Sequence, residues 1–204
     1  MKREIRIFPG SEVRAIGDSN IIKGYASVFG QPSEDLGGFT EYVQKGAFAR
    51  TLADPRSDVR CLFNHDSSCI LGRSAAGTLR LMEDDHGLEF ECDLPDTQMG
   101  RDLRVSIARG DISQCSFGFT VMKQEWDESG DVVKRTLTDV DLFDVSPVTY
   151  PAYPSTSVDV RNLWPDGAPG EVLNRLLCRD ANQFEYDQDT IVRMRDFARV
   201  LSRM

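Results

Sequence analysis

Two residues of this 204-residue chain have the side chains of a nucleophile and its base. His65 follows Leu62-Phe63-Asn64, and Ser116 lies about fifty residues later in Gln114-Cys115-Ser116-Phe117-Gly118-Phe119. A hydroxyl is a poor nucleophile at neutral pH unless a base takes its proton, and neutral imidazole suits that task. Because the chain holds only two histidines, a serine hydrolase would have little choice of base. The pair therefore suggests nucleophilic catalysis by Ser116.

A carboxylate is the expected third member of such a site. Asp144 shares strand parity with the apolar Leu142, which indicates a half-buried carboxylate, and an imidazolium would be a suitable partner for it. Asp139 and Asp141 lie on the opposite parity, and Asp66 follows the histidine directly, so these acids stay open as alternatives. The order His, Ser, acid differs from subtilisin and lipases, and there is no Gly-x-Ser-x-Gly motif.

A zinc site is the competing interpretation of the same region. Cys61-x3-His65-x3-Cys69 resembles part of one, but no fourth ligand follows at a standard spacing and no Cys-x-x-Cys occurs. Cys61, Cys92 and Cys115 alternate with polar neighbours, which is typical of reduced thiols in a core. A glycine-rich phosphate loop is also missing. We therefore expect no metal and no cofactor.

Short strands separated by turns are the elements that would position these residues. Apolar runs and alternation predict strands at 22–29, 41–43, 59–64, 78–82, 88–94, 112–122, 132–137 and 140–150. Helical spacing predicts a short helix at 46–52 and a longer one that begins after Asp96 or Thr97 and ends at Gly110. A set of short strands with one or two interposed helices favours a closed barrel or a sandwich over a doubly wound sheet.

The predicted strand 112–122 has two distinct faces. Its apolar face contains Cys115, Phe117, Phe119 and Val121. Ser116 lies on the other face and is expected to point away from the main core, with Gly118 beside it leaving room for a substrate backbone. His65 is expected at or just past the end of its own strand. The candidate amides for an oxyanion hole lie near Arg73 and in the turn 147–149.

Composition and charge limit the classes of partner. The formal net charge is −9 and the isoelectric point is about 4.8, which argues against nucleic acid, whose phosphates require basic patches. The apolar runs are too short to span a bilayer, and the first residues lack the apolar core of a signal peptide. We expect a cytoplasmic protein whose partner is another protein or a peptide.

The chain divides near residue 164. We predict one catalytic domain at 1–163 and a linker with a helical C-terminal tail at 164–204. Within the second region, the linker lies around 165–170 and the helices at 171–178 and 189–204. Ile191, Met194, Ala198 and Leu201 share one face of the last helix. Because a lone helix of this length cannot bury such a face, we expect it to dock on the first domain, a second copy or another protein.

Several segments of the chain, in order, resemble the prohead proteases of tailed bacteriophages, which are distantly similar to herpesvirus assemblin. The resemblance covers about residues 20 to 160. The segments that carry it are Gly24-Tyr25-Ala26-Ser27-Val28-Phe29, Phe39-Thr40-Glu41, Lys45-Gly46-Ala47-Phe48, Phe63-Asn64-His65-Asp66, Leu71-Gly72-Arg73, Gly77-Thr78-Leu79, Gly87-Leu88, Ser116-Phe117-Gly118-Phe119 and Asp144-Val145-Ser146-Pro147-Val148-Thr149-Tyr150-Pro151-Ala152-Tyr153.

This resemblance implies an α+β fold with a closed, antiparallel-rich seven-stranded β-barrel and a few surrounding helices. It places the family's serine on Ser116 and its histidine on His65, with Asp144 where phage members have an acid. It also implies a serine endopeptidase that works inside the prohead in the host cytoplasm. The expected partners are the major capsid protein with its scaffolding segment and the protease itself, by autoproteolysis or as a homo-oligomer. The alternatives are an inactive assembly module that keeps the fold and a zinc-binding structural protein.

Overall fold

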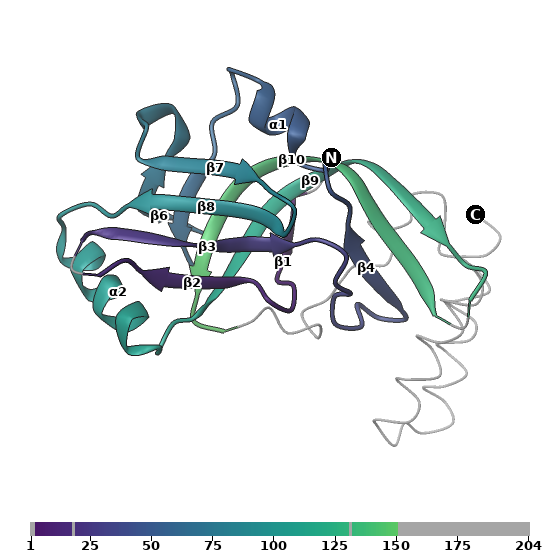
Figure 1. Ribbon diagram of the computed structural model, residues 1–204, viewed down its shortest axis with the longest axis horizontal. Coiled ribbons are helices and arrows are strands. Elements are labelled where there is room, and N and C mark those ends of the chain that lie inside the picture. Colours follow the sequence, from purple (N-terminus) through teal and green to yellow (C-terminus); the bar gives the residue numbers. More distant parts are fainter. Residues whose placement is uncertain (1–2, 18, 131, 151–204) are drawn as a thin grey trace, which may run out of the picture.

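A computed structural model describes residues 3–17, 19–130 and 132–150 of the chain. These residues form two β-sheets with two α-helices (Figure 1). The first sheet contains β1 (Glu4–Arg6), β4 (Phe39–Val43), β5 (Arg60–Phe63), β6 (Asp66–Arg73), β9 (Gln114–Asp127) and β10 (Val133–Val148). The second contains β2 (Glu12–Ala15), β3 (Ile21–Val28), β7 (Leu79–Glu83) and β8 (Gly87–Asp93). The helices are α1 (Ala49–Ala53), α2 (Gln98–Arg109) and a 3₁₀ turn (Ser74–Ala76).

The first sheet is organised around the long antiparallel pair of β9 and β10. Its strand order is β1-β9-β10-β5-β6, and β4 pairs in parallel with the beginning of β10. Near its end, β10 pairs in parallel with β5. In the β9–β10 register, Asp144 lies opposite Gly118 and Ser146 lies opposite Ser116. Because opposed residues share a face of an antiparallel sheet, this register brings Asp144 and Ser116 to the same face.

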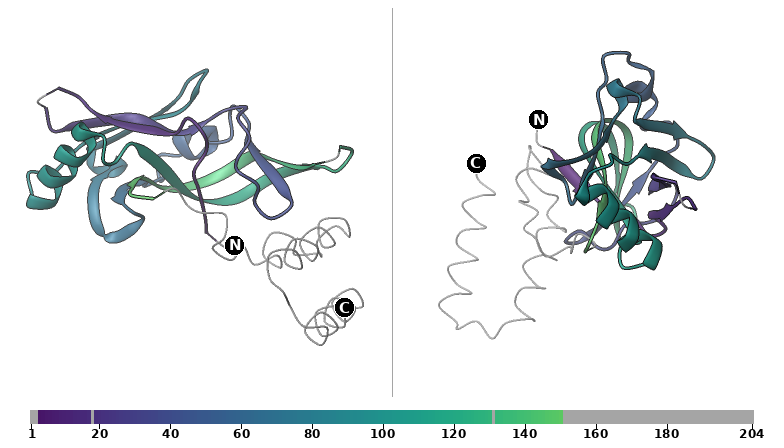
Figure 2. Two further views of the ribbon diagram at one scale, coloured as in Figure 1. Left: turned by 90° about the horizontal axis from the view of Figure 1, so that it is seen from below. Right: turned by 90° about the vertical axis from the view of Figure 1, so that its left-hand side faces the viewer.

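The core lies between the two sheets, whose strands cross in Figure 1. β2 and β3 contact β9, and β6 contacts β8. The aromatic rings of Phe48, Phe117 and Phe119 are fully buried there and pack against one another. Figure 2 shows α2 at the opposite end of the molecule from the turn between β9 and β10. Thr97 caps α2 by accepting a hydrogen bond from Gly100, and the left-handed Gly110 ends it, as predicted.

The prediction of a closed seven-stranded barrel is wrong for the described residues. They form one six-stranded and one four-stranded sheet, and the first sheet ends at β1 and β6, which do not pair with each other. The predicted strands 132–137 and 140–150 are one continuous strand, β10, whose ladder with β9 contains register shifts that let it bend. The predicted linker and tail helices, and the boundary at 163, lie outside the described residues.

A cluster of buried charges joins three strands of the first sheet. Arg135 on β10 is 2% exposed and Glu41 on β4 is 0% exposed. The Arg135 guanidinium donates to Glu41 (Nη1–Oε2, 2.7 Å) and to Glu4 of β1 (Nη1–Oε2, 3.0 Å). Arg6 of β1 donates to Glu41 (Nε–Oε1, 2.9 Å) and to Glu4 (Nη2–Oε2, 2.5 Å). We call these four residues the buried ion cluster; because it holds two acids and two bases, its charges balance.

We expect Glu41→Gln to destabilise the protein by about 3–5 kcal/mol, because it leaves two guanidiniums of the cluster with the single carboxylate of Glu4 and so an uncompensated buried charge. The measurement is urea unfolding followed by circular dichroism. Glu12→Gln is the matched control, since Glu12 is a strand glutamate with a half-exposed side chain 3.9 Å from Arg14. The control should change stability by less than about 0.5 kcal/mol. Equal effects of the two substitutions would show that the cluster does not stabilise the fold.

Candidate functional site

His65 lies in a two-residue turn between β5 and β6. Phe63 pairs with Asp66, so Asn64 and His65 form the turn. Both have positive φ, 53° and 58°, which a type I′ hairpin turn requires at its two central residues. Asparagine and histidine adopt this left-handed conformation more often than most residues other than glycine, but it is uncommon for both. The turn therefore holds the imidazole in one orientation at the cost of some backbone strain.

Asn64 fastens this turn to the end of β10. Its backbone N–H donates to Pro147 O (3.0 Å) and its side-chain amide donates to Thr149 Oγ1 (2.8 Å). The backbone N–H of Thr149 in turn donates to Asn64 Oδ1 (2.9 Å). Because β10 also carries Asp144, these contacts fix the histidine turn relative to the carboxylate.

The imidazole of His65 bridges the other two predicted residues. Its Nδ1 lies 2.5 Å from Asp144 Oδ1, and its Nε2 lies 2.7 Å from Ser116 Oγ. The three side chains come from the β5–β6 turn, β10 and β9. Nδ1–H would donate to the carboxylate, which leaves Nε2 to accept the hydroxyl proton. This is the geometry of a serine that is activated by a histidine whose orientation a carboxylate fixes.

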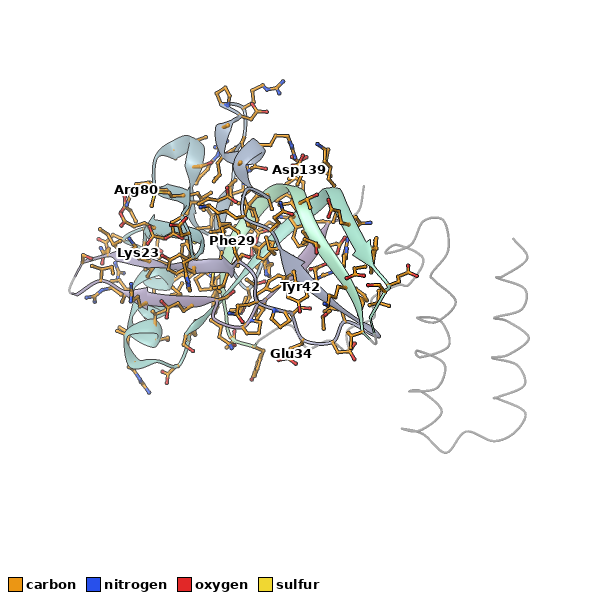
Figure 3. The ribbon with its side chains drawn as sticks, turned by 45° about the vertical axis from the view of Figure 1, so that its right-hand side comes forward. Lys23, Phe29, Glu34, Tyr42, Arg80 and Asp139 are labelled. Carbon is orange, nitrogen blue, oxygen red and sulfur yellow. The ribbon has the colours of Figure 1, made fainter. Side chains whose placement is uncertain are left out.

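The alternative acids make other contacts. Asp139, labelled in Figure 3, lies beside α1 and accepts from Arg50 (Nε–Oδ1, 2.9 Å). Asp141 accepts from the same guanidinium (Nη2–Oδ1, 2.5 Å). Asp66 accepts from the backbone N–H of Ser68 (2.8 Å) within its own turn. Of the four acids weighed from the sequence, the structure brings Asp144 to His65.

Asp144 is a buried carboxylate, 1% exposed, with several donors. It accepts from His65, from Ser146 Oγ (2.8 Å) and from the Arg3 guanidinium. Burial alone would raise the pKa of this carboxyl. The hydrogen bond and charge of His65, the Ser146 hydroxyl and the Arg3 charge outweigh burial and hold the pKa below its ordinary value. The carboxylate is therefore ionised at neutral pH and can stabilise an imidazolium.

Gly118 leaves room for the Asp144 carboxylate. A Cβ at this position would lie 2.3 Å from Asp144 Oδ2 and 3.3 Å from Arg3 Nε. The sequence had suggested that this glycine admits a substrate backbone. The structure shows instead that the acid of the site fills the space.

Gly118→Ala should therefore reduce any activity of the site by about 10- to 100-fold, because the added methyl displaces the carboxylate from His65. The measurement is the initial rate of peptide cleavage, together with the thermal unfolding temperature. Gly130→Ala is the control, since a Cβ there would meet only Val132 O, at 3.9 Å. An unchanged rate for Gly118→Ala would show that Asp144 need not lie where the structure places it.

Ser116 is almost completely buried, with 1% exposed. Its face of β9 points away from the aromatic core, as predicted, but is not open to solvent. Its hydroxyl lies 2.9 Å from the backbone carbonyl oxygen of Arg6 and donates to it. Three residues, Glu4-Ile5-Arg6, are too few for alternation to predict a strand, so this cover was not expected from the sequence.

The two candidate oxyanion-hole segments hold amides that are already engaged. The backbone N–H of Arg73 donates to Thr78 Oγ1 (2.9 Å). The backbone N–H of Thr149 donates to Asn64 Oδ1 (2.9 Å). An oxyanion hole built from either amide would thus need one of these contacts to open.

The cysteines near the site are buried thiols. Cys61, Cys92 and Cys115 are free and buried. The hydrogen bond with Cys92, followed by burial, raises the pKa of the Cys61 thiol, and burial raises that of Cys115, so both stay protonated. Across the described ranges, no group of three or more His, Cys, Asp or Glu side chains could hold a metal ion.

A comparison with family models identifies one family. The sequence model of the family described as caudovirus prohead serine protease matches residues 10–164. Among solved structures, the bacteriophage T4 capsid assembly protease is 11% identical, with a TM-score of 0.47 over 74% of this chain and 98% of that chain. The varicella-zoster virus protease is 13% identical, with a TM-score of 0.29 over 85% of this chain and 84% of that chain. No curated protein matches the sequence. None of the helices in the described residues is long and apolar enough to cross a membrane.

Proposed function

The chain belongs to the caudovirus prohead serine protease family, and from this premise we propose that it is a serine endopeptidase that cleaves capsid proteins during prohead maturation. The observation that carries the proposal is the hydrogen-bonded series from Asp144 through His65 to Ser116 Oγ. Their contacts match the roles that acyl transfer requires of a nucleophile, a base and an orienting acid.

In this mechanism Ser116 Oγ attacks the carbonyl carbon of the scissile peptide bond while His65 Nε2 takes the hydroxyl proton. The resulting imidazolium gives that proton to the leaving amine, so the first product departs and an ester with Ser116 remains. A water molecule then attacks the ester, again with His65 as base, and releases the second product. Asp144 stays ionised throughout and stabilises the imidazolium.

The substrates we propose are the major capsid protein, through its scaffolding segment, and the protease itself. The cleavages would take place inside the prohead, in the infected host. The support is membership in the prohead protease family. An inactive assembly module with the same fold would bind the capsid protein without cutting it, and this difference makes the two functions separable by experiment.

The experiment is coexpression of the full chain with the major capsid protein from the same genome. Intact mass spectrometry then reports the length of the capsid protein. We expect a capsid protein shortened at one end with the wild-type chain and full length with Ser116→Ala. A capsid protein that stays full length with both, although it assembles with the chain, would favour the inactive module and contradict the proposal.

Asp144→Asn should lower the cleavage rate by about 10- to 10⁴-fold, less than removal of the nucleophile or the base. The amide has no negative charge to stabilise the imidazolium, and its NH₂ group can hold His65 in the wrong tautomer. Asp141→Asn is the matched control, because Asp141 contacts Arg50, and its rate should stay within about twofold. A harmful Asp141→Asn together with a silent Asp144→Asn would show that the acid is misassigned.

A further inference from the structure

The N-terminal strand β1 covers the candidate nucleophile. Its residues Glu4–Arg6 pair antiparallel with Phe117–Phe119, directly after Ser116. The Arg6 carbonyl accepts from the Ser116 hydroxyl, and the Arg3 guanidinium pairs with Asp144. The residues that match the family model begin at 10, so β1 precedes the matched region. Residues outside that region, Arg6 of β1 and Arg3 directly before it, thus contact two of the three site residues.

We propose that the edge of β9 beside Ser116 is the binding site for an extended peptide substrate, and that β1 occupies this site as an internal competitor. The inference rests on the proposed function. An edge strand offers unpaired backbone groups to an added peptide strand, and β-strand addition is a common mode of peptide recognition. A peptide that took the place of β1 would have its backbone paired with β9 and one carbonyl at Ser116.

Ser116 cannot react while β1 is in place, for two reasons, so the full chain reacts only through molecules from which β1 has been released. A hydroxyl has one proton, so Ser116 cannot donate to the Arg6 carbonyl and to His65 at the same time. The serine is also 1% exposed, which leaves no path for the carbonyl carbon of another chain to reach its oxygen. Release of β1 removes both obstacles.

The charges of β1 allow it to leave. Glu4 and Arg6 pair with each other through Arg6 Nη2 and Glu4 Oε2 at 2.5 Å, so they depart as a neutral pair. Glu41 and Arg135 remain hydrogen-bonded to each other at 2.7 Å and stay neutral as a pair. Beyond this pair, only Asp144 among the described residues loses an opposite charge, that of Arg3, and it keeps its hydrogen bonds with His65 and Ser146. The ladder is only three residues long and lies at the edge of its sheet.

The same cluster defines the class of peptide that fits. Positions two residues apart on a strand share a face. Glu4 can therefore contact Arg135 while Arg6 contacts Glu41. A competing peptide would carry a carboxylate at the Glu4 position and a guanidinium at the Arg6 position. The carbonyl group of its basic residue would lie beside Ser116, and cleavage requires its carbon, rather than its oxygen as in β1, to face Ser116 Oγ. The inferred ligand is thus an extended peptide of the pattern acid, any residue, arginine.

The test compares the full chain with a variant that lacks residues 1–6. Phe8 stays in this variant because it is 1% exposed and stacks on Phe117. The readout is the rate at which a fluorophosphonate modifies Ser116, measured by peptide mass spectrometry. A second, full-length variant, Glu4→Gly with Ile5→Pro and Arg6→Gly, breaks β1 without shortening the chain. We expect modification at least about tenfold faster in both variants than in the full chain.

A synthetic peptide with the sequence of residues 3–8 should slow modification of the shortened variant again. The matched control is the peptide with the residues of positions 4 and 6 exchanged, which has the same composition and net charge. Equal inhibition by both peptides would overturn the acid and arginine pattern. Equal or slower modification of both variants than of the full chain would overturn the competitor role and leave the proposed function standing. If Ser116 is modified in none of the proteins, the proposed function fails and the inference fails with it.

Discussion

Ser116→Ala is expected to lower the rate of peptide-bond cleavage by on the order of 10⁴-fold or more, because no other side chain of the site can take over the attack. The thiols of Cys61 and Cys115 are buried and protonated, so they cannot replace the hydroxyl. The fold should remain. The substitution removes the hydrogen bond to Arg6 O and costs about 1 kcal/mol, which thermal unfolding can measure.

A second buried serine provides the control. Ser27 on β3 is as buried as Ser116, and its hydroxyl has no hydrogen-bond partner within the described part of the chain. Ser27→Ala should keep the full rate of cleavage and lose no stability. Cleavage that survives Ser116→Ala at an undiminished rate, with the capsid protein cut at the same bond, would refute Ser116 as the nucleophile.

His65→Ala should be comparably damaging, because Ser116 would then have no base within hydrogen-bond reach of its hydroxyl. Residues that act as one unit are strongly non-additive, so the double variant Ser116→Ala/His65→Ala should be no slower than either single variant. His86→Ala is the control, since His86 packs edge-to-face against Tyr25 and the substitution should leave the rate unchanged. Steady-state rates for the four proteins complete the comparison.

A double variant much slower than both single variants would show that the serine and the histidine act separately. A normal rate for His65→Ala at neutral pH would show that Ser116 uses another base. Either result would require a different mechanism even if Ser116 itself proved essential.

Alternation along strands predicted the parts of the fold that depend on local pattern. The acids and apolar residues of 88–94 alternate and form β8, and the spacing of Leu103 and Ile107 gave the buried face of α2. Parity also favoured Asp144 over Asp141, and the structure places Asp144 against His65. Such patterns are informative because one buried and one exposed face leave a direct trace in the sequence.

Features that depend on distant charge pairs left no such trace. Glu41 and Arg135 look like solvated residues in the sequence, and their burial is favourable because they pair with each other and with Glu4 and Arg6. β1 was missed for the same reason. The left-handed turn at Asn64 and His65 has no glycine to reveal it, and it is held by contacts with Pro147 and Thr149 at the end of β10. The family resemblance implied a closed seven-stranded barrel. Within the described residues, the first sheet instead has unpaired edges at β1 and β6.

The most direct test of the central claim, that His65 activates Ser116, is the site and rate of fluorophosphonate modification in the full chain. Such reagents form a covalent bond with an activated serine oxygen, and mass spectrometry of the digested protein locates it. The account predicts an adduct on Ser116 that forms at least about 100-fold more slowly in His65→Ala. An adduct on a different serine, or equal rates in the two proteins, would contradict it.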